Sequence, residues 1–162
     1  MAARAFSQTS QLGAVLDMVT DRFSTNVLLA VLAHLYVDYA IFCFFLMVLD
    51  IVSHWTHMYA SLLTGSGSHK DMSNSNFLIR LYYQSKPVLF TVCMAEQLVY
   101  FGLYLMYFTS DTGLAFEDSV FHVASAIALF AAPLHVFKQG MNFLQLYYAC
   151  EALNEWDLRK QR

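Results

Sequence analysis

Three residues near the start of the chain have the types and spacing of a metal-assisted reaction site. Gly13, Asp17 and Asp21 follow one another at intervals of four, so in a helix they lie on one face, about one turn apart. Two carboxylates on one face within a membrane segment are costly unless they are paired, hydrated or metal-bound. Mg²⁺ or Mn²⁺ would offset their repulsion, because these ions prefer hard oxygen ligands. The spacing alone is explained equally well by an alternative without a metal, in which both Asp residues lie at the cytosolic end of a membrane helix and are hydrated.

The wider string around these residues resembles the signature of the CDP-alcohol phosphatidyltransferases. Ala3 and Arg4 are followed by eight residues and then by Gly13, Asp17 and Asp21. The signature consists of Asp-Gly, two residues, Ala-Arg, and then a Gly, an Asp and a second Asp with this spacing. The resemblance implies a membrane-embedded site in which four Asp residues bind two divalent ions, Mg²⁺ or Mn²⁺. These ions act on the pyrophosphate of a CDP-linked lipid.

The resemblance also implies a role for each matching residue. Asp17 would be a metal ligand, and Asp21 would be both a metal ligand and the catalytic general base. Arg4 would hold the phosphates of the CDP-diacylglycerol, Ser10 would place a hydroxyl against the nucleotide lipid, and Gly13 would let substrate or a helix approach the backbone. These roles agree with the general chemistry, since metals neutralise phosphoryl charge while a base takes a proton from the attacking alcohol.

One part of the signature has no counterpart in the chain. Counted back from Ala3, the Asp-Gly pair would precede Met1. The sequence therefore predicts a single membrane domain, 1–162, that is N-terminally truncated and corresponds to the last four spans of a six-span fold, lacking the first two helices and their metal ligands. We expect such a chain to be inactive unless a segment that carries these ligands is supplied. The alternative is a non-catalytic isoform that acts as a structural or regulatory membrane partner of the intact enzyme.

The elements that position these residues must be membrane helices. Of the 162 residues, 58% are hydrophobic and only 13% are charged, a composition typical of a chain that exposes apolar side chains to lipid. The net charge of −3 argues against a nucleic-acid-binding protein, because such proteins carry a basic surface. The sequence predicts an all-α bundle with about four spans, followed after Gly140 by an amphipathic helix that either continues the last span or lies at the interface. The expected spans are 23–37, 39–63, 87–108 and 120–136.

The basic residues predict the orientation of these spans, because cytosolic loops carry the Lys and Arg residues. The connections around 36–39 and 109–119 contain no Lys or Arg. The remaining segments contain all nine basic residues: Arg4, Arg22, Lys70, Arg80, Lys86, Lys138, Arg159, Lys160 and Arg162. The pattern predicts a multi-pass protein with both termini in the cytosol.

Within the family, four further segments are similar to the eukaryotic phosphatidylinositol synthases. They are 16–22, 50–55, 65–70 and the run from 80 to 87. The resemblance implies transfer of a phosphatidyl group from CDP-diacylglycerol to myo-inositol with release of CMP, by a homodimer in the endoplasmic reticulum membrane. A transporter that lines its pathway with acidic residues is the weakest interpretation, since no long polar stripe runs through all four spans.

A second polar face is predicted on the span 39–63. Asp50, His54 and His57 recur at helical spacing. They form a polar face packed inside the bundle, contribute to the inositol pocket, or bind a metal. His54, together with Arg80 and His69, is our candidate for contacts with inositol or phosphate, and Glu96 is expected to face the protein interior.

Overall fold

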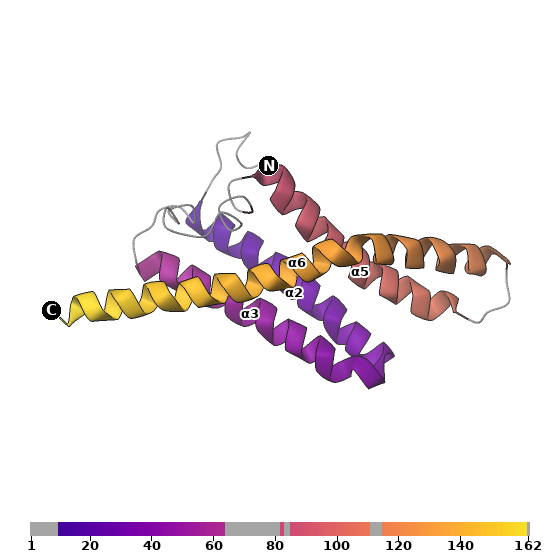
Figure 1. Cartoon of the computed structure of the whole chain (residues 1–162), viewed down its shortest axis with the longest axis horizontal. Helices are drawn as coiled ribbons and strands as arrows, with labels where there is room; N and C mark the ends of the chain where they lie inside the picture. Colours follow the sequence, from indigo (N-terminus) through magenta and orange to yellow (C-terminus); the bar gives the residue numbers. More distant parts are fainter. Residues whose placement is uncertain (1–9, 64–81, 83–84, 111–114, 162) are drawn as a thin grey trace.

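The computed structural model describes residues 10–63, 82, 85–110 and 115–161, and these are helical almost throughout (Figure 1). The elements are α2 (Gln11–Leu35), the short 3-10 helix η1 (Val37–Tyr39), α3 (Ala40–Leu63), α5 (Lys86–Thr109) and α6 (Ala115–Lys160). The described part of the chain contains no strand. The expected all-α architecture is confirmed.

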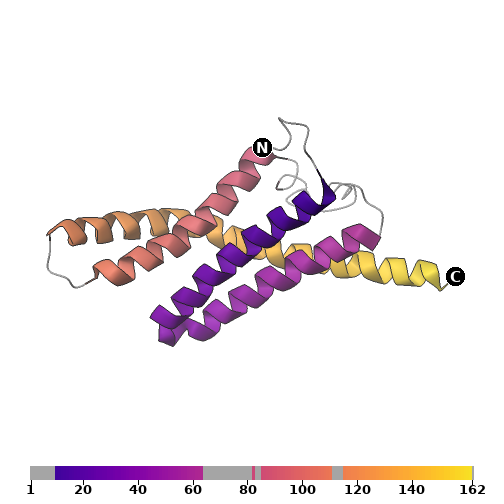
Figure 2. The ribbon, with the colours of Figure 1, turned by 180° about the vertical axis from the view of Figure 1, so that it is seen from behind.

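Helices α2 and α3 form an antiparallel pair that turns at η1. The turn is closed by backbone hydrogen bonds from the Tyr36 N–H to the Leu32 carbonyl (2.8 Å) and from the Tyr39 N–H to the Tyr36 carbonyl (2.9 Å). The Tyr36 hydroxyl also donates to the backbone carbonyl of Leu103 in α5, at 2.8 Å. This tight turn fixes the register of α2 on α3, so the N-terminal half of α2 lies beside the C-terminal half of α3 (Figure 2).

Helix α6 is long enough to pack on two other helices in turn. Its 46 residues correspond to a length of about 70 Å at 1.5 Å per residue, and it packs along α5 and α3 (Figures 1 and 2). Pro133 lies inside it, yet the helix continues through Gly140. The segment after Gly140 therefore continues the last span as one helix. Near its start α6 packs closely on α5, where a Cβ added to Gly102 would lie 3.0 Å from the Cβ of Ala128.

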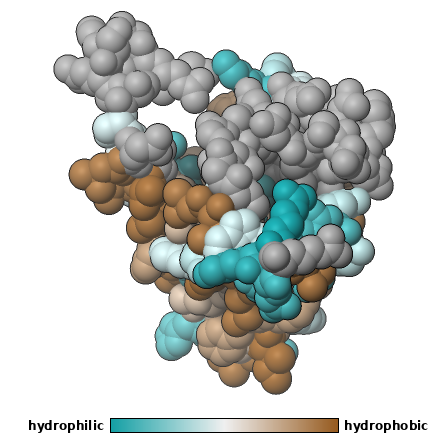
Figure 3. Space-filling view, turned by 90° about the vertical axis from the view of Figure 1, so that its left-hand side faces the viewer, coloured by the Kyte–Doolittle hydropathy of each residue, from teal (hydrophilic) through white to brown (hydrophobic). Residues whose placement is uncertain are grey.

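The side chains are distributed as in a bundle surrounded by lipid. The core is built from residues such as Leu29 and Leu32, which are almost fully buried. Many large apolar side chains point outward instead, and Ile41, Leu129 and Phe130 are 85%, 77% and 88% exposed. In water such exposure would be costly, whereas in hydrocarbon it is not. Figure 3 shows hydrophilic side chains gathered around the C-terminal end of α6, next to apolar surface.

Three of the four expected spans are confirmed as helices long and apolar enough to cross a membrane. They cover Val37–Leu63, Lys86–Thr109 and Phe116–Lys160. The remaining expected span, 23–37, falls largely in α2, which has 25 residues but carries three charged side chains in its first half. That half is the part of the molecule in which the candidate reaction site lies.

Candidate active site

The predicted acidic face lies on the N-terminal half of α2. The helix is regular from Gln11 onward, so Asp17 and Asp21 lie one turn apart, and both side chains are exposed. Ser10 is the N-cap, and its Oγ accepts a hydrogen bond of 2.9 Å from the backbone N–H of Gly13. A Cβ on Gly13 would lie 3.0 Å from that Oγ. The small residue and the cap together leave the backbone of the first turn accessible beside the acidic face.

The chemistry of these two carboxylates fits a divalent cation in part. Both carboxylates are hard oxygen ligands, and neither is buried between the helices. Because they lie one turn apart, they can bind the same ion. The described residues hold no group of three or more His, Cys, Asp or Glu side chains arranged for a metal. Asp17 and Asp21 therefore supply two ligands, and further oxygen atoms would have to come from water, substrate or another segment. The roles of Asp17, Asp21, Ser10 and Gly13 remain predictions.

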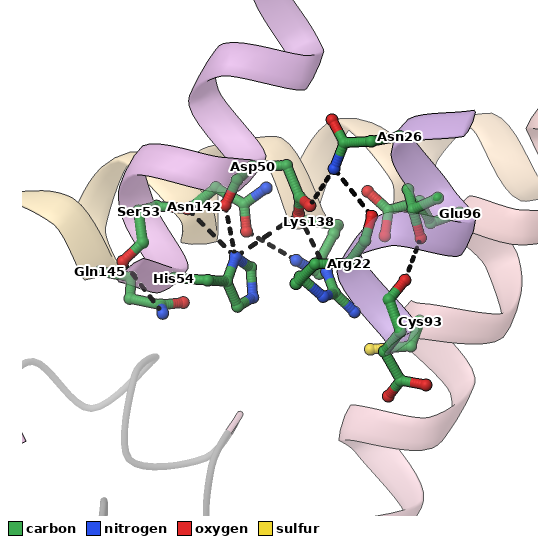
Figure 4. A network of polar contacts seen from close by, with 12 residues as sticks. Arg22, Asn26, Asp50, Ser53, His54, Cys93, Glu96, Lys138, Asn142 and Gln145 are labelled. Atoms are coloured by element: carbon green, nitrogen blue, oxygen red, sulfur yellow. Dashed lines mark hydrogen bonds and ion pairs between the residues drawn. The ribbon is translucent and has the colours of Figure 1, made fainter. Parts of the chain in front are cut away.

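A second polar cluster lies inside the bundle, and each of the four long helices contributes one charged residue to it (Figure 4). Arg22 comes from α2, Asp50 from α3, Glu96 from α5 and Lys138 from α6. Asp50, Glu96 and Lys138 are 3%, 1% and 1% exposed. Two cations and two carboxylates give a formally balanced set. Because charges are costly away from water unless they are compensated, this cluster favours one arrangement of the four helices.

The best-paired member of the cluster is Asp50. Its Oδ1 accepts a hydrogen bond from Arg22 Nη1 at 2.9 Å, and its Oδ2 accepts one from Asn26 Nδ2 at 3.2 Å. His54 Nδ1 lies 3.4 Å from Oδ1 and 2.8 Å from the backbone carbonyl of Asp50. One turn of α3 further on, Gln145 of α6 donates to the carbonyl of Ser53 at 3.4 Å. Polar contacts thus join α3 to both α2 and α6.

The α5–α6 side of the cluster is less completely paired. Gln139 Nε2 donates to Glu96 Oε1 at 2.9 Å, while Glu96 Oε2 is buried and has no hydrogen-bond partner among the described residues. Lys138 Nζ donates to Asn142 Oδ1 at 2.6 Å. Glu96 thus keeps an unpaired carboxylate oxygen on this side, whereas the unpaired atom on the Asp50 side, Asn26 Oδ1, belongs to a neutral amide.

The structure decides some of the site predictions and leaves others open. The interpretation of Asp50 and His54 as a polar face packed inside the bundle is confirmed, and so is the inward placement of Glu96. Contact of His54 with inositol remains a prediction. The other three candidates, Arg4, His69 and Arg80, lie outside the described residues.

The predicted position of Lys138 was wrong. The sequence places it after the span 120–136 on the cytosolic side, but Lys138 is buried within α6 and faces the other helices. Sequence reasoning also missed that Arg22 and Asn26 bind Asp50. The signal was the spacing of Arg22 and Asn26, four residues apart in the same helix, but nothing in the sequence identified their partner.

The chain is similar to curated proteins over nearly its whole length. It is 42% identical over 158 residues to a CDP-diacylglycerol–inositol 3-phosphatidyltransferase of Saccharomyces cerevisiae, covering 97% of this chain and 68% of that protein. Enzymes with the same name from Homo sapiens and Candida albicans are 39% and 40% identical over 166 and 157 residues, covering 99% and 96% of this chain. The chain spans 76% of the human protein and 64% of the Candida protein. No family profile and no solved structure matches it.

Proposed function

Because the chain belongs to the family of CDP-diacylglycerol–inositol 3-phosphatidyltransferases, we propose that it transfers a phosphatidyl group from CDP-diacylglycerol to myo-inositol with release of CMP. The observation that carries this proposal is the identity of 36–42% to enzymes of that name across 96–99% of the chain. The exposed acidic face of α2 supports it, since it offers carboxylates to a substrate rather than to the packing of the bundle.

In the proposed reaction, Asp21 is the general base. Its carboxylate takes the proton from the attacking hydroxyl of inositol. The inositol oxygen then forms a bond to the phosphorus that bears the diacylglycerol, the bond from that phosphorus to the bridging pyrophosphate oxygen breaks, and CMP leaves. The exposed position of Asp21 leaves its side chain available for this proton transfer.

The neighbouring residues would bind and orient the CDP-diacylglycerol. Ser10 and Gly13 lie at the N-terminus of α2, where the helix dipole favours an anionic group, and Arg4 would add a positive charge. Asp17 and Asp21 would together hold Mg²⁺ or Mn²⁺, which when bound offsets the negative charge of the pyrophosphate.

We place the protein in the endoplasmic reticulum membrane with both termini in the cytosol, where the water-soluble substrate inositol is available, and we propose that it forms a homodimer.

The proposal is tested by incorporation of labelled myo-inositol into lipid. Membranes of a host that incorporates no inositol by itself are prepared with the expressed chain, CDP-diacylglycerol and Mg²⁺ or Mn²⁺. The expected result is a labelled lipid that requires CDP-diacylglycerol, with unlabelled inositol as an effective competitor and serine or glycerol 3-phosphate as ineffective ones. Absence of labelled lipid would instead support the non-catalytic alternative.

A further inference from the structure

Arg22 directly follows Asp21 in α2, but the two side chains point in different directions. Successive residues of a helix are rotated by about 100°. The side chain of Asp21 is exposed, whereas Arg22 reaches into the bundle and binds Asp50 of α3 at 2.9 Å (Figure 4). Because they are neighbours on one rigid helix, the direction of Arg22 determines the direction of Asp21.

The carboxylate of Asp50 holds α2 at two points. Arg22 donates to one of its oxygens and Asn26, one turn later, donates to the other at 3.2 Å. Asn26 also donates to the backbone carbonyl of Arg22 at 2.8 Å, which keeps its amide in place. A single hydrogen bond would constrain this turn of α2 less tightly than two. Two bonds one turn apart, made to a carboxylate that is only 3% exposed, resist both rotation and sliding.

A second contact holds the same turn from the side of α5. Gln97 Nε2 donates to Thr25 Oγ1 at 2.8 Å. Thr25 Oγ1 in turn donates to the backbone carbonyl of Asp21 at 3.1 Å. Helices α3 and α5 therefore both fix the turn of α2 that begins at Asp21.

Little else among the described residues holds the N-terminal half of α2. Leu12, Leu16 and Phe23 are 68%, 54% and 64% exposed, and the first buried residues along the helix are Thr25 and Asn26. The apolar core that could fix this half by packing begins at Leu28 and Leu29. The polar contacts at Arg22, Thr25 and Asn26 are thus the first hydrogen bonds between α2 and the other described helices.

From this arrangement we infer that Arg22, held by Asp50, is a positioning residue for the acidic face, and that it sets the direction in which Asp17 and Asp21 point. Its effect on the rate rests on the proposed function, whereas its effect on the placement of α2 does not. Arg22 acts through Asp21 rather than on the substrate, so its loss misplaces the base and the metal ligands without removing them. A displacement of about 1 Å at such groups can lower a rate about 100-fold.

The kinetic arm of the test compares Arg22→Ala, Arg22→Lys and Asp50→Ala with the double variant R22A/D50A. Arg22→Ala is expected to lower kcat about 100-fold and to change the KM for inositol by less than about threefold, since binding is affected less than the transition state. Arg22→Lys should recover part of the rate, because it keeps the charge but not the planar fork. The double variant should be no slower than the slower single variant, because both changes break one contact.

The structural arm needs no activity. Spin labels are placed on cysteines that replace the exposed residues Leu16 of α2 and Tyr59 of α3, after Cys43, Cys93 and Cys150 have been changed to serine. Arg22→Ala should shift or broaden the distribution of distances between these labels. A matched label pair at the exposed positions 31 and 44, on the other side of the Arg22–Asp50 contact, should keep its distribution in the same variant.

The control variant is Arg159→Ala, which removes an exposed ion pair with Glu155 (3.3 Å, side chains 80% and 59% exposed). It should change neither the rate nor either distance distribution. If Arg22→Ala leaves the distribution between positions 16 and 59 unchanged, the inference is overturned. It is also overturned if that distribution changes while kcat stays at the unsubstituted level. If the unsubstituted chain incorporates no inositol, the proposed function fails, and the distances still decide whether Arg22 places the acidic face.

Discussion

Helix α2 presents two faces that are polar for opposite reasons. Asp17 and Asp21 lie on a face that the other described helices leave exposed, whereas Arg22 and Asn26 lie on a face that binds Asp50 inside the bundle. Among the described residues, no side chain forms a hydrogen bond or ion pair with Asp17 or Asp21, whereas Arg22 and Asn26 are held by protein contacts. Carboxylates open to a ligand and side chains that hold the helix are thus adjacent residues of α2, and a substitution can address either face.

The largest effect is expected on the exposed face. Asp21→Asn preserves shape but removes the base, so the rate of inositol incorporation should fall on the order of 1,000-fold. The temperature of unfolding in detergent should not change, because the side chain is exposed. The matched control is Asp38→Asn, an exposed acid in η1 just beyond the opposite end of α2, which should retain full activity. A similar loss in both variants would remove the distinction between the two ends of the helix.

On the buried face the larger effect should be on stability. Asp50→Ala removes the partner of Arg22, whose side chain is only 14% exposed. Breaking such a buried ion pair lowers the free energy of unfolding by about 3 kcal/mol. Thermal unfolding in detergent should show the loss as a lower midpoint. Glu155→Ala, which breaks the exposed pair with Arg159, should cost less than about 1 kcal/mol. Equal costs would mean that burial of the network contributes nothing.

The network also depends on close contact between α5 and α6, which carry Glu96 and Lys138. Gly102→Ala would place a Cβ 3.0 Å from the Cβ of Ala128 and 3.1 Å from the carbonyl oxygen of Ala124. We expect it to destabilise the fold by about 1 to 2 kcal/mol, because a backbone atom cannot move aside easily.

The matched control for Gly102 is Gly140, also in a helix, where an added Cβ meets nothing within 4 Å. Gly140→Ala should stabilise the helix by up to about 1 kcal/mol. Differential scanning fluorimetry of the two variants should therefore give shifts of opposite sign. Shifts of the same sign would contradict close packing at Gly102.

The smallest effect separates two roles of Ser10. Ser10→Ala removes the N-cap of α2 and should cost about 1 kcal/mol or less in stability, while Ser10→Asn keeps a capping side chain. If capping is the whole role, Ser10→Asn restores the rate of inositol incorporation. If the hydroxyl also contacts the nucleotide lipid, Ser10→Asn remains slow while its stability recovers.

The two faces also differ in how far the sequence predicts them. Asp17 and Asp21 were identified because the spacing within one helix is a local property. The contact of Arg22 with Asp50 joins residues 28 positions apart, and its prediction requires the register of α2 on α3, which the turn at Tyr36 sets. The inward orientation of Glu96 was predictable from its place in an apolar span.

Lys138 shows the limit of charge counting. A lysine near the expected end of a span indicates a cytosolic loop. However, α6 continues past Gly140, so Lys138 lies in the middle of the helix and is buried. The sequence allowed both a continuing and an interfacial helix after Gly140. Only the packing of α6 against α3 and α5 decides between them, because it buries Met141, Asn142 and Gln145.

The most direct test of the central claim is the stoichiometry of CMP release by the purified full chain in lipid nanodiscs that contain CDP-diacylglycerol. We expect one CMP to be released for each myo-inositol incorporated, with a requirement for Mg²⁺ or Mn²⁺ and no release by Asp21→Asn. The proposed reaction is excluded if the folded chain releases no CMP when inositol is added, or if Asp21→Asn releases it equally well.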